Sequence, residues 1–123
     1  MDYGKNTVCV YYNIKNTNNR ATFTIAPIMN FRDFHTMNTD HYYKVHEKIE
    51  NRKVRVTIDD NKTTPIYMYS SEGNYIEHTD DTFKNMFYLK EEQRGFYPEE
   101  DLSVPGRYEI IIKPKENKEI TFI

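Results

Sequence analysis

Apolar and polar residues alternate along most of the chain, and a period of two is the pattern of a half-buried β-strand. The alternation is clear over residues 7–14 and again over residues 22–29. Residues 15–20, which lie between these runs, are all polar and typical of a turn. We therefore expect the two runs to pair as a β-hairpin whose register is fixed by the buried face.

The same pattern predicts further short strands along the rest of the chain. They are expected at residues 53–58, 65–70, 75–78, 83–89, 107–112 and 119–123. A turn at residues 59–62 should join the first two of these strands as a second hairpin. Tyr42, Val45 and Ile49 have helical spacing, so one short helix is predicted over residues 41–50. With seven to nine short strands and no sizeable helix, the predicted fold is an all-β antiparallel β-sandwich.

Two segments break the alternation, and the longer one covers residues 88–106. Gly95 is expected to supply a backbone angle that other residues avoid. Pro105 and Gly106 fit the two central positions of a type II turn that would precede the strand at 107–112. The guanidinium of Arg94 should form an ion pair with a nearby carboxylate. The candidates for that carboxylate are Glu91, Glu100 and Asp101.

The second irregular segment covers residues 30–43. One interpretation is structural, with Phe31 and Phe34 anchoring a loop and Arg32 covering the sheet edge. Asp33 would then hydrogen-bond nearby backbone amides, as Asp commonly does in turns. A role in contacting a ligand stays open as the alternative.

Size and composition limit the class of protein. The 123 residues suffice for one domain with a real core, but not for two, and the whole of 1–123 is treated as one domain or a part of a larger one. Leu and Ala are scarce while Ile, Val, Thr and Tyr are abundant, which favours sheet. The net charge is only −2, so a nucleic-acid partner is not expected.

The cellular setting is predicted from cysteine usage and from the longest apolar runs. Cys9 is the single cysteine, which excludes an internal disulfide and suits a reducing compartment. No apolar run is long enough for a signal sequence or a membrane span. We expect a cytoplasmic protein without a membrane partner. The apolar end at 120–123 and the early first strand are typical of a segment of a larger protein.

Few residue patterns in the chain suggest catalysis or metal binding. The four histidines, His35, His41, His46 and His78, do not stand at a recognised metal-ligand spacing, so no metal or cofactor is expected. Asp33 with Glu100 or Asp101 could form the carboxylate pair of a glycosidase. Carboxylates beside Arg94 are more often ion-paired, which lowers the pKa and makes them poor proton donors. No catalytic residue is therefore assigned.

Aromatic residues make up 15% of the chain, with eleven tyrosines and seven phenylalanines. Aromatic faces can stack on sugar rings, so one cluster could form a glycan platform. Core packing and cross-strand pairs explain most such rings in a small sheet domain. Tryptophan, which offers the largest ring for stacking, is absent.

A set of motif residues in the segment from Phe83 to Gly106 has a spacing found in one family. These residues are Tyr88, Glu91, Arg94, Gly95, Glu100, Asp101, Leu102, Pro105 and Gly106. In this spacing the segment resembles the end of the N-terminal domain of bacterial and archaeal glycogen debranching enzymes of the amylo-α-1,6-glucosidase type. Residues 6–8 and 27–35 also resemble that domain, in the same order. Thr82 and Tyr97 depart from the family pattern, which often has tryptophan and an acid at these positions, and its upstream glycine-rich and Arg-Tyr-His-Gly motifs are not present.

The resemblance implies a parent protein that hydrolyses α-1,6-linked glucose at glycogen branch points. This chain would be a non-catalytic segment that packs against a helical-toroid catalytic domain, and glycogen or a malto-oligosaccharide is its candidate ligand. Two alternatives stay open: a self-contained glycan-binding module, and an assembly domain that dimerises through exposed edge strands. The candidate interface or glycan-proximal residues are Arg32, Asp33, His35, Arg94, Glu100 and Asp101.

Overall fold

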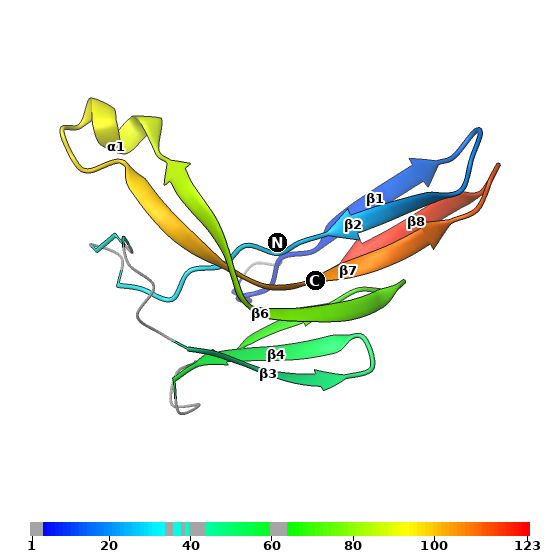
Figure 1. Ribbon diagram of the computed structural model, residues 1–123, viewed down its shortest axis with the longest axis horizontal. Coiled ribbons are helices and arrows are strands. Elements are labelled where there is room, and N and C mark those ends of the chain that lie inside the picture. Colours follow the sequence, from blue (N-terminus) through cyan, green and yellow to red (C-terminus); the bar gives the residue numbers. More distant parts are fainter. Residues whose placement is uncertain (1–3, 34–35, 38, 40–43, 60–63) are drawn as a thin grey trace.

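The computed structural model describes residues 4–33, 36–37, 39, 44–59 and 64–123. This part of the chain is built from eight β-strands and one short helix (Figure 1). The predicted all-β fold is confirmed. The elements are β1 (Val10–Lys15), β2 (Ala21–Ile25), β3 (Val45–Glu50), β4 (Lys53–Ile58), β5 (Ile66–Tyr69), β6 (Asn74–Phe87), α1 (Leu89–Gln93), β7 (Glu99–Ile112) and β8 (Asn117–Phe122).

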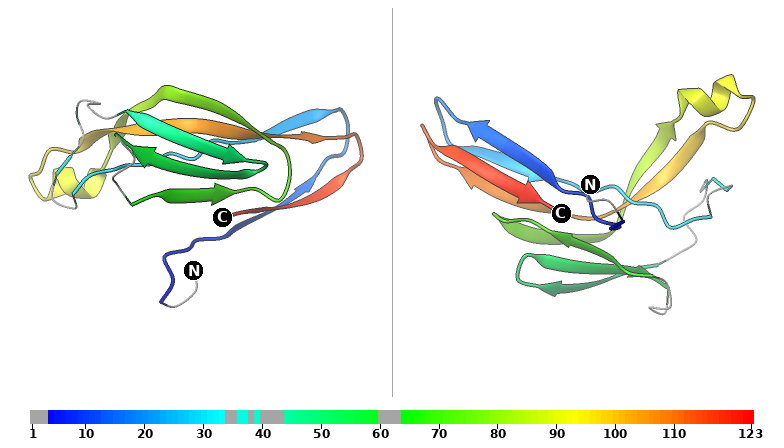
Figure 2. Two further views of the ribbon diagram at one scale, coloured as in Figure 1. Left: turned by 90° about the horizontal axis from the view of Figure 1, so that it is seen from below. Right: turned by 180° about the vertical axis from the view of Figure 1, so that it is seen from behind.

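The strands form three antiparallel sheets with the orders β1–β8, β2–β7–β6 and β3–β4–β5. Figure 2 shows the third sheet packed beneath the other two, which gives a sandwich-like arrangement. The core lies between the sheets, since apolar side chains from β4, β5, β7 and β8 are almost fully buried. These include Val54, Val56, Met68, Tyr108, Ile110, Ile112 and Ile120.

The predicted hairpin between the first two strands is wrong. β1 pairs with β8, so that Tyr12 lies opposite Ile120, whereas β2 pairs with β7, so that Phe23 lies opposite Ile110. The rings of Tyr12 and Phe23 pack edge to face, with centroids 5.1 Å apart. The first two strands therefore meet through side chains rather than through backbone hydrogen bonds, and the connection between them is an arch.

The predicted helix at residues 41–50 is also wrong where the structure describes it, because residues 45–50 form strand β3. This strand pairs with β4, and Val45 lies opposite Ile58. Asn51 begins the two-residue turn between the strands with a positive φ of 57°, which Asn tolerates better than most residues. Pairing with β4 overrides the helical spacing of the apolar residues. The predicted β4–β5 hairpin is confirmed.

The predicted type II turn at Pro105 and Gly106 does not form, because both residues lie inside the long strand β7. Gly106 is needed there for a different reason. A Cβ atom at this position would collide with the carbonyl oxygen of Ile76 and with the ring of Tyr75, both on β6. The glycine thus permits a close approach of two backbones, as glycines inside strands often do.

The far half of the β6–β7 pair, together with α1, projects away from the rest of the molecule (Figure 1). We call this part, residues 81–103, the arm. A bulge between Phe83 and Met86 bends β6, and Asn85 in that bulge has a φ of 56°. The backbone N–H of Asn85 donates a 3.0 Å hydrogen bond to the carboxylate of Asp101 on β7. Asp101 therefore stabilises the bend of the arm.

The five-residue α1, at the tip of the arm, buries no side chain. In the described residues, no helix has the length and apolar character needed to cross a bilayer.

Candidate functional site

Glu100 is a buried carboxylate near the tip of the arm, opposite Met86, with none of its side chain exposed. One oxygen, Oε1, accepts hydrogen bonds from the side-chain amide of Asn30 and from Nε of Arg32. The other, Oε2, accepts bonds from Nη2 of Arg32 at 3.2 Å and from the hydroxyl of Tyr88 at 2.9 Å. A buried charge is tolerated only when it is paired and hydrogen-bonded, and here four donors meet that need.

The loop that supplies Asn30 and Arg32 is held against the arm by its backbone. The N–H groups of Met29 and Ser103 each donate to the other residue's carbonyl oxygen, at 2.9 Å in both cases. Phe31 packs against the core cluster, which confirms its predicted role as an anchor. Because Glu100 lies only three residues before Ser103 on β7, this bridge brings the loop's polar side chains to the carboxylate.

The network fixes the charge states of the groups that meet Glu100. The hydrogen bond to Glu100 raises the pKa of Arg32, so its guanidinium stays charged. Burial, and then the hydrogen bond to Glu100, raises the pKa of the Tyr88 hydroxyl, so it stays a neutral donor. We call Glu100, Arg32, Asn30 and Tyr88 the clamp, because they join the loop, β7 and the end of β6.

Arg94 pairs with Glu91, one of its three predicted partners, at 3.1 Å. This pair is exposed, with 65% of the arginine side chain accessible. The guanidinium also lies over the ring of Phe96, 5.2 Å from the centroid. Glu100 and Asp101 are bonded instead to Arg32 and to the backbone of Asn85.

The turn after Arg94 ends α1 with a Schellman motif. Gly95 has a φ of 79°, which confirms its predicted role. Its N–H donates to the carbonyl of Glu92, and the N–H of Phe96 donates to the carbonyl of Glu91. The motif fixes the direction in which Phe96 and Tyr97 leave the helix.

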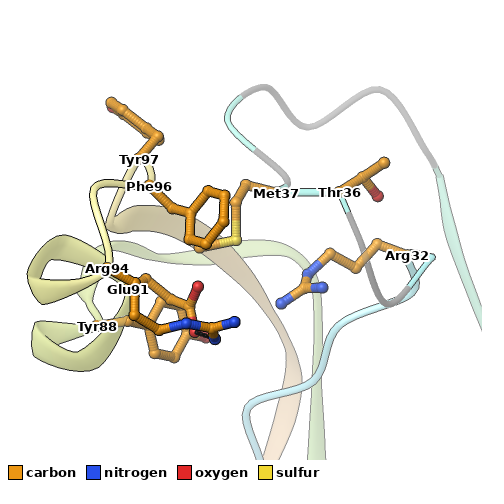
Figure 3. Close-up of a pocket in the computed structure, with 8 residues that line it drawn as sticks. All are labelled: Arg32, Thr36, Met37, Tyr88, Glu91, Arg94, Phe96 and Tyr97. Atoms are coloured by element: carbon orange, nitrogen blue, oxygen red, sulfur yellow. Dashed lines mark hydrogen bonds and ion pairs between the residues drawn. The ribbon is translucent and has the colours of Figure 1, made fainter.

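A cavity of about 590 Å³ lies between the tip of the arm and the loop after Arg32 (Figure 3). Arg32 points from the loop toward the arm, where Arg94 and Glu91 lie. Its lining residues are Arg32, Thr36, Met37, Tyr88, Glu91, Arg94, Phe96 and Tyr97.

The structure brings some of the predicted site residues together and separates others. Arg32 and Arg94 line the cavity, and Glu100 anchors one wall of it. Asp33 is exposed, and its backbone carbonyl accepts two 3.2 Å hydrogen bonds, from the N–H and the hydroxyl of Thr36. The carboxylate of Asp101 accepts a hydrogen bond from the backbone of Asn85 in the β6 bulge. His35 and the second predicted anchor, Phe34, lie outside the described residues.

Sequence reasoning did not assign Asn30, Tyr88 or Phe96 to the site. Tyr88 could have been found, since it belongs to the motif that also contains Glu91 and Arg94. Asn30 and Phe96 carry no such signal, because an asparagine in a loop or an aromatic residue after a helix is common in any sheet protein.

Other candidate chemistry lies outside the cavity. In the part of the chain that the structure describes, no three histidine, cysteine or carboxylate side chains gather as a metal site would require. A smaller hollow of about 250 Å³ lies on the β3–β4–β5 sheet. There Lys48 pairs with Glu50 at 2.8 Å, and Lys53 lies over the ring of Tyr67.

Comparison with known proteins gave one match. The family described as glycogen debranching enzyme N terminal matches residues 1–119. No curated protein and no solved structure gave a significant match. The match confirms the resemblance inferred from the motif residues.

Proposed function

The chain belongs to the glycogen debranching enzyme N-terminal family, and from this premise we propose that it acts as a non-catalytic domain that supports the catalytic domain of such an enzyme. The parent enzyme would hydrolyse α-1,6-glucosidic branch linkages in glycogen, in the cytoplasm. In this role, the arm would contact the catalytic domain.

The observation that carries this proposal is that the arm is fixed in place by the clamp and also carries exposed apolar side chains. The clamp holds the end of the arm against the loop through a carboxylate that is fully buried. Large apolar side chains are exposed along the arm on both sides of the clamp, with Phe83 at 47%, Phe87 at 46% and Leu89 at 55%. Apolar side chains that gather on a projecting element are typical of a surface that binds another protein. A rigid arm loses little conformational entropy when it docks.

A non-catalytic role is supported by the state of the acidic residues. A glycosidase needs a carboxylic acid that can give a proton to the leaving oxygen. Glu100 instead accepts four hydrogen bonds, two of them from a guanidinium. Asp101 accepts a backbone hydrogen bond that stabilises the bulge. Both carboxylates are used to hold the structure of the arm.

The test compares the 123-residue chain with the protein encoded by the complete reading frame. The chain alone should release no glucose from a limit dextrin. In a protein that includes the catalytic domain, the double substitution Phe87→Ala and Leu89→Ala should lower the thermal stability of that domain. Tyr67→Ala, which removes a 54% exposed ring on β5, is the matched control and should leave it unchanged. Glucose release by the chain alone, or equal effects of the double variant and the control, would contradict the proposal.

An assembly role is a second candidate, and the edge strand β1 favours it. β1 pairs with β8 along one side, and Tyr11 on it is 78% exposed. Among the described residues, the other side of β1 pairs with no strand, and such an edge can pair with a second chain. Light scattering of the purified chain tests for the dimer, and Tyr11→Lys should weaken it.

A further inference from the structure

Each guanidinium that lines the cavity is already paired with a carboxylate. Arg32 is bound by Glu100, and Arg94 lies 3.1 Å from Glu91. An anionic ligand would therefore have to displace a carboxylate or enter a site without surplus positive charge. A neutral ligand meets no such penalty.

The lining nevertheless offers many directed polar groups. A guanidinium carries five N–H donors, so Arg94 keeps donors beyond the one that Glu91 takes, whereas Nη1 of Arg32 already donates to the carbonyl of Asp33 at 3.0 Å. Glu91 contributes acceptor oxygens on a side chain that is 34% exposed, and Thr36 adds a hydroxyl. Neighbouring donors and acceptors of this kind match the vicinal hydroxyl groups of a sugar.

Apolar ring faces lie beside these polar groups. Phe96 and Tyr97 are both 58% exposed, although each has a large apolar surface to bury. The guanidinium of Arg94 lies 5.2 Å from the centroid of the Phe96 ring, so an aromatic surface and a hydrogen-bond donor lie together in the cavity wall. A pyranose ring has one apolar face of C–H groups that can pack on an aromatic ring, while its hydroxyls point outward.

The walls are held in place before any ligand arrives. Tyr88 and Arg32 are fixed by the buried Glu100, and the opposite wall follows the Schellman turn at Gly95. The volume of about 590 Å³ falls within the range of about 300–1,000 Å³ that is usual for small-ligand sites. The cavity is thus sized and preorganised for a ligand of a few sugar units.

From the charge balance, the exposed rings and the fixed walls, we propose that this cavity binds a short stretch of neutral α-linked glucan. One sugar packs on Phe96, and its hydroxyls bond to Arg94 and Glu91. The choice of an α-glucan among neutral oligosaccharides rests on the proposed function. The site would hold a glucan chain beside the docked catalytic domain.

Calorimetric titration of the 123-residue chain with maltohexaose tests the proposal, and saturable binding is expected. Phe96→Ala should weaken it by about tenfold or more. Tyr67→Ala is the matched control, because Tyr67 is a 54% exposed ring on β5 and does not line the cavity. Circular dichroism checks that both variants fold. The absence of saturable binding, or equal affinities of the two variants, would overturn the proposal.

Two competitors test the ligand class. Inorganic phosphate should not displace maltohexaose, because both arginines are already paired with carboxylates. Cellohexaose, which is β-linked, should bind more weakly. Displacement by phosphate would overturn the neutral assignment, and equal affinity for cellohexaose would overturn the α-glucan assignment.

These results are separable from those on the scaffold role. If maltohexaose fails to bind while the Phe87 and Leu89 double variant still destabilises the catalytic domain, the glucan site is wrong and the scaffold role stands. If maltohexaose binds while that double variant matches its Tyr67 control, the scaffold role is wrong and the glucan site stands.

Discussion

Arg32 and Glu100 form a two-point ion pair across 68 residues of sequence, and the glutamate has no exposed side-chain surface. Glu100→Ala would leave a guanidinium and the amide of Asn30 without their shared acceptor. We expect a loss of about 3 kcal/mol in the free energy of unfolding, somewhat moderated because Arg32 is partly exposed. Urea denaturation measures it. Glu92→Ala, on the exposed surface of α1, is the control and should change stability by less than about 0.5 kcal/mol. Equal midpoints for the two variants would show that the clamp does not stabilise the arm.

Arg94→Ala should have a much smaller effect on stability than Arg32→Ala. The partner of Arg94 is Glu91, and their pair is exposed to solvent. Exposed ion pairs stabilise proteins by about 0–1 kcal/mol, and salt screens them. Urea denaturation at low and high salt should show a small, salt-dependent loss for Arg94→Ala and a large, less salt-dependent loss for Arg32→Ala. Similar losses for the two arginine variants would be inconsistent with the burial seen here.

Local patterns predicted the parts of the fold that depend on neighbours in sequence. The β4–β5 hairpin and the positive φ of Gly95 follow from alternation and from turn chemistry over a few residues. The Arg94–Glu91 pair was among the predicted options because its members are three residues apart. In each case the information lies within one short window.

The errors arise where distant segments decide the structure. The alternation of apolar and polar residues in β1 and β2 is the same whether the two strands form a hairpin or an arch. The arch forms because β1 pairs with β8 and β2 pairs with β7, both of which lie at the C-terminal end of the chain. Sequence spacing could not show that Asn30 and Arg32 lie beside Glu100, because they are about 70 residues apart in the chain. The sequence had offered only Arg94 as a cationic partner of Glu100. Pro105 and Gly106 were predicted to form a turn because the sequence does not distinguish a glycine needed for close packing from a glycine needed for a turn.

Gly106→Ala should destabilise the fold strongly through collision and not through backbone strain. The added methyl group would meet the backbone carbonyl of Ile76 and the ring of Tyr75. Overpacking of this kind costs about 1–3 kcal/mol or more, because backbone cannot move aside easily. Gly95→Ala makes a useful comparison: its Cβ would meet open space, but its φ of 79° should cost about 1 kcal/mol. Thermal unfolding of both variants tests the order, and a smaller loss for Gly106→Ala would contradict the close approach of β6 and β7.

Glu47 makes the stability of the sheet packing depend on pH. Its carboxyl on β3 accepts a 2.5 Å hydrogen bond from the hydroxyl of Tyr75 on β6, so this contact joins two sheets. Burial raises the pKa of Glu47 from 4.5 to about 7, the hydrogen bond from Tyr75 opposes that shift, and the charge of Glu77 adds to it. In the described residues, the second oxygen, Oε2, is buried without a hydrogen-bond partner, which suits a carboxyl that carries the proton there.

A raised pKa means that the folded protein keeps a proton that the unfolded chain has released. The stabilisation from this group is therefore complete below about pH 4.5 and is lost as the pH rises through about 7. We expect the free energy of unfolding to fall by about 2 kcal/mol across this window. Glu47→Gln keeps an acceptor for Tyr75 but cannot ionise, so its stability should vary less with pH and exceed that of the unmodified protein at pH 8. Urea denaturation at a series of pH values measures this, with Glu119→Gln as an exposed control. A Glu47→Gln profile that follows the unmodified protein through the window would show that Glu47 is ionised in both states.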